Sequence, residues 1–380
     1  MTIIPLSLYI HIPWCVRKCP YCDFNSHQMP DEIPEADYIE ALLRDLESEL
    51  PHIWGRPIES IFIGGGTPSL FSAEGIDALL RGLRERLPLR PTMEITLEAN
   101  PGTFEQERFS AYREAGINRL SIGIQSYNAG HLKALGRIHN AEEAINAAHI
   151  AKQAGFDNFN LDLMHGLPQQ TPEQAMHDLQ KAISFAPTHI SWYQLTIEKN
   201  TLFHHSPPLL PDDEHLWQIQ KQGQSLLADA GYTQYEVSAY AQKNRQCIHN
   251  INYWEFGDYL GIGAGAHGKI TQPDGTITRH QKYRQPARYT KEALQGKARS
   301  ATTTLEKQDK IFEFMLNTLR LKEGFNKVAF ERRTGLPLSK IDSNIKQATH
   351  QGLLQQTRND QYCATKQGWF FLNNLIEIFL

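Results

Sequence analysis

The 380-residue sequence has few cysteines, no long apolar run and no excess of charge of either sign. Five cysteines are too few for a disulfide scaffold in a chain of this length, and their odd number suits a reducing compartment. Because 38 Lys and Arg residues nearly balance 42 Asp and Glu residues, the overall charge gives no reason to expect nucleic acid or an anionic membrane as a partner.

Signals for export or membrane insertion are also missing. No stretch reaches the ~20 apolar residues of a transmembrane segment. The first residues lack the cationic start and the apolar core of a signal peptide. We therefore expect a cytoplasmic protein whose contact with a membrane, if it makes one, is peripheral and at the inner face.

Short segments rich in β-branched and aromatic residues alternate with longer amphipathic segments, which is the pattern of βαβ units and a parallel sheet. The six predicted strands are Ser7–Pro13, Ser60–Gly64, Glu94–Ala99, Arg119–Gln125, Phe159–Met164 and His189–Thr196. The predicted helices between them are Pro34–Leu50, Ala73–Arg86, Phe104–Ala115, Ala141–Ala154 and Pro172–Phe185. The sequence thus predicts an α/β fold, with six βα units in residues 1–200.

Alternation along the strands separates aliphatic from polar side chains. Because successive side chains point to opposite faces, the aliphatic residues would pack on the helices. The other face would carry Tyr9, Glu98, Gln125 and Asp162. A closed eight-stranded barrel fills its interior mainly with branched aliphatic residues, so this polar face predicts a partial, TIM-like (β/α)6 barrel that holds a ligand at the C-terminal ends of its strands.

The rest of the chain is expected to form two further regions. Residues 201–300 would flank the barrel, with a helix at Glu214–Ala230 and a segment dense in aromatics and glycines at 246–268. Residues 301–380 are polar and helix-rich, which suits a mainly α, winged-helix-like domain. The apolar end of the chain, Trp369–Leu380, is interpreted as core packing.

Three of the cysteines, Cys15, Cys19 and Cys22, lie in the loop after the first predicted strand. Clusters of thiolates bind zinc or iron–sulfur centres. A closed zinc site needs four ligands, and His11 and His27 are the nearby candidates for the fourth. Three cysteines suit a cubane cluster with one iron open to a further ligand, and a trio of unliganded thiols is the other alternative.

The spacing CxxxCxxC, with Tyr21 before its last cysteine and a partial barrel around it, resembles the radical S-adenosylmethionine superfamily over about residues 8–198. The resemblance implies that Cys15, Cys19 and Cys22 hold three irons of a [4Fe–4S] cluster. It also implies that the fourth iron chelates S-adenosylmethionine.

The same resemblance assigns residues to S-adenosylmethionine. Glycines allow a backbone to approach a ligand closely, so the N–H and C=O groups of Gly65, Gly66 and Thr67 would hold its methionine end. The side chains that the resemblance implies are Tyr9, Tyr21, Glu98, Gln125, Arg137 and Asp162. For Arg137, a surface ion pair is the alternative. No residue is assigned a catalytic role.

Longer strings, such as LYIHIPWCVRKCPYCDF and NLDLMHGLPQQT, resemble the coproporphyrinogen III oxidase-like branch. That branch contains radical dehydrogenases of coproporphyrinogen III and haem chaperones. Phe24 stands where the dehydrogenases have a further cysteine, and the first predicted strand begins within ten residues, without their N-terminal extension. His249-Asn-Ile-Asn-Tyr253 matches an HNxxY motif of the chaperones.

The resemblance therefore implies a haem chaperone that passes haem to acceptor haem proteins, among them membrane-bound respiratory subunits. It also implies that residues 301–380 form the helical C-terminal domain of this branch. A radical enzyme acting on a porphyrin is the main alternative. A protein that keeps the cluster and its cofactor only as structural or regulatory ligands is a third. A homodimer is left open.

The haem candidates are His249, Asn250, Tyr253 and Cys247. A neutral imidazole binds haem iron, so His249 is the predicted axial ligand, with Tyr253 or Cys247 as a second ligand or an orienting group. Four aromatics could supply a flat apolar surface for a porphyrin, namely Tyr253, Trp254, Phe256 and Tyr259. His267 is a weaker candidate, and a purely structural role is the alternative for His249.

Overall fold

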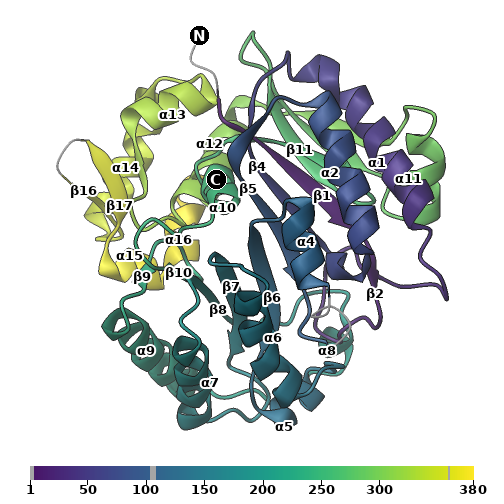
Figure 1. Ribbon diagram of the computed structural model, residues 1–380. Helices are drawn as coiled ribbons and strands as arrows, with labels where there is room; N and C mark the ends of the chain where they lie inside the picture. The colour runs from purple at the N-terminus through teal and green to yellow at the C-terminus, as the bar shows by residue number, and fades with distance from the viewer. Residues whose placement is uncertain (1–3, 103–107, 358–359) are drawn as a thin grey trace.

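The computed structural model describes residues 4–102, 108–357 and 360–380 (Figure 1). Six parallel strands follow one another in the sheet in chain order, and they confirm the predicted βα repeat. They are β1 (Leu6–Ile12), β4 (Ile58–Gly65), β5 (Leu89–Ala99), β6 (Arg119–Gln125), β7 (Phe159–His165) and β8 (His189–Gln194). The predicted boundaries hold to within a few residues, apart from β5, which begins earlier.

The predicted helices between these strands also form. They are α1 (Glu35–Glu49), α2 (Ala73–Arg86), α4 (Phe109–Ala115), α6 (Ala141–Gln153) and α7 (Pro172–Ser184), and a short α5 (Ala129–Ala134) precedes α6. Residues 104–107 of the predicted helix Phe104–Ala115 lie outside the described residues. Capping boxes at Asn140 and Thr171 begin α6 and α7, because each side chain accepts a backbone N–H that the first helical turn leaves without a partner.

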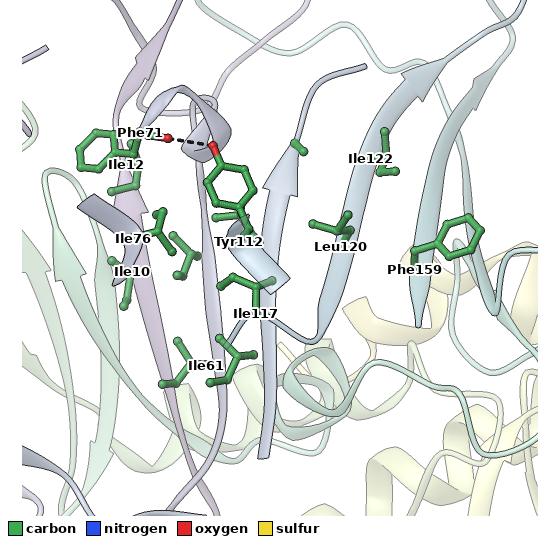
Figure 2. Packing of buried hydrophobic residues seen from close by; sticks show 14 of the residues in the cluster. Ile10, Ile12, Ile61, Phe71, Ile76, Tyr112, Ile117, Leu120, Ile122 and Phe159 are labelled. Atoms are coloured by element: carbon green, nitrogen blue, oxygen red, sulfur yellow. Dashed lines mark hydrogen bonds between the residues drawn. The ribbon is translucent and has the colours of Figure 1, made fainter. Parts of the chain in front are cut away.

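The aliphatic faces of the strands pack under these helices, as their alternation predicted. Figure 2 shows Ile10 and Ile12 of β1 pointing to the same side as Leu120 and Ile122 of β6. The hydroxyl group of Tyr112, on α4, donates a hydrogen bond of 2.8 Å to the carbonyl oxygen of Phe71, as the dashed line shows. The helices therefore cover one face of the sheet, and the polar side chains remain on the other.

The sheet extends beyond the six predicted strands at both edges. Its full order is β14-β13-β12-β11-β1-β4-β5-β6-β7-β8-β10-β9, and it is not closed into a barrel. The added strands are β9 (Thr233–Gln234), β10 (Ala239–Ala241), β11 (Asp258–Gly263), β12 (His267–Thr271), β13 (Ile277–Lys282) and β14 (Arg299–Thr304). Strand β11 runs parallel to β1, whereas β12 to β14 and β9 to β10 are antiparallel to their neighbours.

Four helices lie among these added strands, namely α8 (Leu202–His205), α9 (Asp213–Asp229), α10 (Ile248–Trp254) and α11 (Pro286–Ala293). The helix α9 confirms the one predicted at Glu214–Ala230. The short helix α10 leads directly into β11, and its His249 lies next to Ser60 of β4, so the HNxxY motif lies beside the interior strands β11, β1 and β4 of the sheet.

The C-terminal region forms a small helical module beside the sheet (Figure 1, yellow-green). Its helices are α12 (Lys307–Thr318), α13 (Lys327–Thr334), α14 (Asp342–His350), α15 (Lys366–Phe370) and α16 (Leu372–Glu377). A three-stranded sheet in the order β15-β17-β16 completes it, with β15 (Phe325–Asn326), β16 (Leu354–Gln356) and β17 (Gln361–Ala364). Leu375, Ile376 and Phe379 are buried in its core, which confirms the packing role of the chain's end.

No helix in the described part of the chain combines the length and the apolar character that a bilayer crossing requires.

Candidate functional site

The cysteine loop is held in place by two short parallel strands. Strand β2 (Trp14–Cys15) pairs with β3 (His27–Gln28), which brings the two ends of the loop together. Within the loop, the Cys22 N–H donates to the Cys19 carbonyl oxygen at 3.2 Å. All three cysteines line one cavity of about 440 Å³ beside the C-terminal ends of β4, β5 and β6.

Each thiol of this cavity has a polar neighbour. The Thr67 hydroxyl donates to Cys15 Sγ at 3.5 Å, an Arg137 N–H donates to Cys19 Sγ at 3.8 Å, and Cys22 Sγ lies 3.5 Å from Ser26 Oγ. Donors and a cation beside sulfur stabilise thiolates, which are the form that binds iron. Three thiols that line one cavity fit the protein ligands of a [4Fe–4S] cluster, of which each would hold one iron.

Neither histidine considered for a zinc site faces the thiols. His11 Nε2 donates to the Asn25 carbonyl oxygen at 2.9 Å, and His11 Nδ1 accepts from the Tyr9 hydroxyl at 3.0 Å, so both ring nitrogens are engaged. His27 lines a different cavity, next to α11. Within the described ranges, no three His, Cys, Asp or Glu side chains are arranged to hold a single metal ion.

The glycine loop after β4 touches the cysteine loop through its backbone. A Cβ atom at Gly66 would lie 2.5 Å from the Trp14 carbonyl oxygen, so only glycine fits there. The N–H groups of Gly66 and Thr67 donate to the carbonyl oxygens of Ile12 and Trp14, and that of Gly65 donates to Glu98 Oε2. The expectation that these N–H groups hold a ligand needs correction, because the protein already uses them. Any backbone contact with a ligand falls to carbonyl oxygens.

Two carboxylates lie on the inner face beneath this loop. Asp162 accepts hydrogen bonds from Ser121 Oγ at 2.9 Å and from Asn160 Nδ2 at 2.7 Å, and burial raises its pKa. Burial and the neighbouring Asp162 also raise the pKa of Glu98 to about 8. Both side chains line the cavity of the cysteines, so they could accept hydrogen bonds from the hydroxyl or amino groups of a ligand.

Gln125 and Arg137 complete this cavity from β6 and the segment after it. Gln125 has a positive φ of 67°, uncommon for a residue other than glycine. Its Oε1 accepts from the Tyr193 hydroxyl at 2.8 Å. Arg137 donates to Asn100 Oδ1 at 2.6 Å and to the Gly123 carbonyl oxygen at 2.9 Å, and its Nε has no partner. Its guanidinium group therefore faces the site, and it makes no ion pair with the residues that the structure describes.

Tyr21 and Tyr9 lie at different places. Tyr21 lines the cavity of the cysteines, and burial raises the pKa of its hydroxyl group although the Arg137 cation opposes this. Tyr9 lines a second, larger cavity of about 1000 Å³. The two cavities adjoin, because they share the lining residues Phe24, Gly65, Glu98, Ser121, Asp162 and Ser191.

His249 lies on the wall of the larger cavity, in the first turn of α10. Its ring centroid is 5.1 Å from that of Phe62 and 6.3 Å from that of Tyr9, and its Nδ1 is 3.2 Å from Ser60 Oγ. Its Nε2 has no hydrogen-bond partner among the described residues. Burial, with a smaller contribution from Arg119, lowers the pKa of His249 to about 3, so the imidazole is neutral.

Not all of the other haem candidates line the larger cavity. Asn250 and Tyr253 line the larger cavity with His249, but Cys247 does not. Cys247 Sγ is fully buried and donates to Glu94 Oε1 at 3.6 Å, and burial raises the pKa of the Cys247 thiol to about 12. Cys247 therefore lies in the protein interior just before the first residue of α10, and its thiol does not line the cavity.

Of the four aromatics considered for a porphyrin surface, two face the larger cavity. Tyr253 and Tyr259 line it. Phe256 is buried in the core of the C-terminal module, and Trp254 lies beneath Arg320, whose guanidinium carbon is 5.5 Å from its ring centroid. The aromatic lining of the cavity also includes Tyr9 and Phe62, whose rings lie next to that of His249.

Several residues of the larger cavity were not predicted from the sequence. They are Phe62, Arg119, Arg279, Gln281, Arg284 and Glu313. Arg279 and Gln281 come from β13, which follows the turn Pro273-Asp274-Gly275. An Asp-Gly pair between two alternating segments is a hairpin signal, so this part of the wall could have been recognised.

The raised pKa of Glu98 makes the stability of the cofactor-free protein depend on pH. Between about pH 4.5 and pH 8, Glu98 keeps its proton in the folded state and loses it in the unfolded state. The stability that depends on this proton is present at low pH. As the pH rises through this range, the free energy of unfolding falls by up to about 1.4 kcal/mol per pH unit. We expect the free energy of unfolding in urea to fall more steeply from pH 5 to 8 in the wild type than in Glu98→Gln. Parallel slopes would contradict the assignment.

Comparison with known proteins places this site in a family. Residues 9–182 match the Radical SAM superfamily, and residues 305–371 match the HemN C-terminal domain. The chain is 53% identical to the heme chaperone HemW of Escherichia coli (strain K12), over 99% of this chain and 98% of that protein. It is 54% identical to the heme chaperone HemW of Haemophilus influenzae, with 99% and 98% covered.

A solved structure of coproporphyrinogen III oxidase (HemN) from Escherichia coli, a radical SAM enzyme, has the same fold. Its TM-score is 0.83 at 24% identity, and the match covers 99% of this chain and 90% of that one. The fold, the cysteine motif and the full-length similarity agree with one another. The chain therefore belongs to the HemW family, within the radical S-adenosylmethionine superfamily.

Proposed function

We propose that this chain is a haem chaperone that binds haem in the larger cavity and passes it to acceptor haem proteins. It would hold a [4Fe–4S] cluster and S-adenosylmethionine in the adjoining cavity of the cysteines. Two relatives named heme chaperone HemW share more than half of its residues over nearly its whole length. The observation that carries the haem part is His249, a neutral imidazole with an unpartnered Nε2 on the wall of a cavity of about 1000 Å³.

The chain's own residues would divide the work in the smaller cavity. Cys15, Cys19 and Cys22 would ligate the cluster, and the Arg137 cation beside Cys19 would offset part of the negative charge of the thiolates. Glu98 and Asp162 would accept hydrogen bonds from the cofactor on the inner face. When bound, such a cluster and S-adenosylmethionine together supply one-electron chemistry that can generate a 5′-deoxyadenosyl radical.

In the larger cavity, His249 would ligate the haem iron, and aromatic rings would pack on the porphyrin plane. Tyr9 and Phe62 approach from β1 and β4, and Tyr253 follows His249 by four residues on α10, one helical turn away. Glu94 fixes the start of this helix, because its Oε1 accepts from the N–H groups of Ile248 at 2.9 Å and of His249 at 3.3 Å. The ring therefore projects from an anchored backbone.

We expect His249→Ala to weaken haem binding by at least about tenfold, since changes outside the ligand sphere alone cost metal affinity on that scale. A haem titration followed by the Soret band measures the effect, and the band should also change shape when an axial ligand is lost. The matched control is His204→Ala, an exposed histidine that lines neither cavity. An unchanged spectrum and affinity in His249→Ala would remove His249 from the haem site.

A radical enzyme acting on a porphyrin is the second candidate function. It is favoured by the six residues that the two cavities share, because a porphyrin in the larger cavity would lie next to the cofactor in the smaller one. Phe24, one of the shared residues, stands where the dehydrogenases have a further cysteine. Anaerobic incubation with coproporphyrinogen III, S-adenosylmethionine and a reductant should yield no protoporphyrinogen. Turnover at an enzymatic rate would favour the enzyme instead.

Haem transfer tests the proposed function itself. The haem-loaded protein is mixed with an apo haem protein, and the Soret bands of the donor and the acceptor are followed together. Transfer faster than release of haem to buffer alone is the expected result. Equal rates would show passive release and would overturn the chaperone proposal.

We also propose that transfer takes place in the cytoplasm, at the inner face of the membrane, and that the acceptors include membrane-bound respiratory subunits. The support is the small, odd number of cysteines, which suits a reducing compartment, and the similarity to proteins named heme chaperone HemW. Haem transfer to haem-depleted inverted vesicles, with right-side-out vesicles as the control, tests the side of the membrane.

Light scattering before and after haem loading tests for a homodimer.

A further inference from the structure

One wall of the larger cavity is formed by the hairpin of β12 and β13, which carries polar and cationic side chains. Arg279 and Gln281 lie two residues apart on β13, so they share a face, and His267 of β12 pairs in register with Gln281. Arg284 lies two residues beyond the end of β13. All four side chains line the cavity.

The arginines of this cavity differ in what they already bind. Arg279 already has an anionic partner, because its Nε and Nη2 donate to the Glu313 carboxylate and its Nη1 donates to the Tyr259 hydroxyl. Arg119 is buried and faces Glu94 Oε2 at 3.9 Å. Arg284 is exposed and its side chain has one contact, from Nε to Asn25 Oδ1 at 3.5 Å. It makes no ion pair with any described residue.

The backbone of Arg284 is nevertheless held in place. The amide group of Asn25 donates to the Arg284 carbonyl oxygen at 2.8 Å and to the Ala264 carbonyl oxygen at 2.9 Å. Gly265 allows this approach, since a Cβ atom there would lie 2.4 Å from Asn25 Nδ2. The side-chain amide of Gln281, on the same cavity wall, has no hydrogen-bond partner among the described residues. An uncompensated guanidinium group and a free amide donor are thus held on one wall of the cavity.

A guanidinium group offers two parallel N–H donors that match the two oxygens of a carboxylate. Haem carries two such carboxylates, on its propionate side chains. We infer that Arg284, with Gln281 beside it, binds a propionate of haem at the open side of the larger cavity. This inference rests on the proposed haem site and adds a specificity to it, namely selection of porphyrins with free carboxylate side chains.

The test compares haem with haem dimethyl ester, in which both carboxylates are blocked. Each ligand is titrated against the wild type, Arg284→Ala and the control Arg288→Ala. Arg288 is an exposed arginine that stacks on Tyr283 and does not line the cavity. We expect Arg284→Ala to bind haem about tenfold more weakly, as for loss of a hydrogen bond to a charged group. Its affinity for the ester should equal that of the wild type, and Arg288→Ala should match the wild type for both ligands.

The outcomes separate this inference from the proposed function. If Arg284→Ala loses the same factor for haem and ester, or loses nothing for haem, the propionate contact is overturned while haem binding stands. If the wild type binds neither ligand, the haem function and the propionate contact fall together. Arg284→Lys keeps the charge, so it should recover part of the haem affinity that Arg284→Ala loses, and its affinity for the ester should equal that of the wild type. This pattern excludes a general folding defect.

Discussion

Serine in place of Cys15, Cys19 or Cys22 is expected to leave the reconstituted protein with almost no iron or acid-labile sulfide. A [4Fe–4S] cluster held by three thiolates has no spare protein ligand, so the loss of one removes a third of the ligand set. The neighbourhood offers no replacement, because both ring nitrogens of His11 are hydrogen-bonded and His27 faces another cavity. Iron and sulfide analysis after anaerobic reconstitution measures the effect.

The two remaining cysteines provide matched controls for this result. Cys247 is buried behind α10, and Cys363 is buried in β17 of the C-terminal module. Neither lines the cavity of the cysteines, so Cys247→Ser and Cys363→Ser should keep the wild-type iron content. A cluster that survives in all three loop variants, or that is lost in Cys363→Ser, would contradict the assignment.

The central sheet and its helices could be predicted from the sequence because both depend on local periodicity. In β6, Leu120 and Ile122 are fully buried against the helices while Gln125 reaches the site, as the two-residue period requires. Capping residues such as Asn140 also mark helix starts without any tertiary information. The three loop cysteines belong to the same class, since their spacing and their place after the first strand are both local.

The added strands could not be predicted in the same way. Strand β11 pairs with β1 in parallel, with Leu6 opposite Asp258, so this edge depends on residues about 250 positions apart. Nothing in the local pattern of either segment specifies such a partner. Because β11 is rich in aromatics and glycines, its composition favoured a ligand surface, and no strand was predicted there. The wall formed by β12 and β13 differs, because the Asp274-Gly275 pair between these strands is a local hairpin signal that the prediction did not use.

Two errors at the candidate site have a simpler cause, which is that neighbours in sequence need not face the same cavity. Cys247 precedes His249 by two residues, but it lies before the first residue of α10 and turns toward Glu94. The glycine loop was expected to offer its N–H groups to a ligand, but those of Gly66 and Thr67 complete the junction with the cysteine loop. The sequence identifies residues whose chemistry suits contact with a ligand. Packing determines which of those residues remain accessible to one.

The largest effect on stability is expected at Lys282, whose side chain is 1% exposed. Its ammonium group contacts both Asp45 and Glu49 of α1, which are also buried, and thereby joins β13 to that helix. Tyr289 donates to Asp45 at 2.8 Å, and Arg299 pairs with Glu49 from β14. These five groups satisfy one another and only Arg299 is partly exposed, so the removal of Lys282 leaves buried negative charge that water solvates poorly.

Lys282→Met should therefore lower the free energy of unfolding by about 3–5 kcal/mol at neutral pH, the cost of leaving a buried charge without its partner. Lys297→Met, at an exposed lysine, should change it by no more than about 0.5 kcal/mol. Urea unfolding of the cofactor-free proteins measures both. A loss below about 1 kcal/mol in Lys282→Met would show that the cluster contributes packing without charge compensation.

The pH dependence of this loss separates charge from packing. In the wild type, burial alone would raise the pKa of Glu49, but Arg299 and Lys282 together lower it to about 2. That stabilisation is present above the unfolded value of about 4.5 and is lost as the pH falls toward 2. In Lys282→Met, the carboxyl groups lose a cation and bind protons more readily when folded, so the variant gains stability as the pH falls. The difference between wild type and variant should therefore shrink from pH 8 to pH 5, whereas a packing defect would cost the same at both.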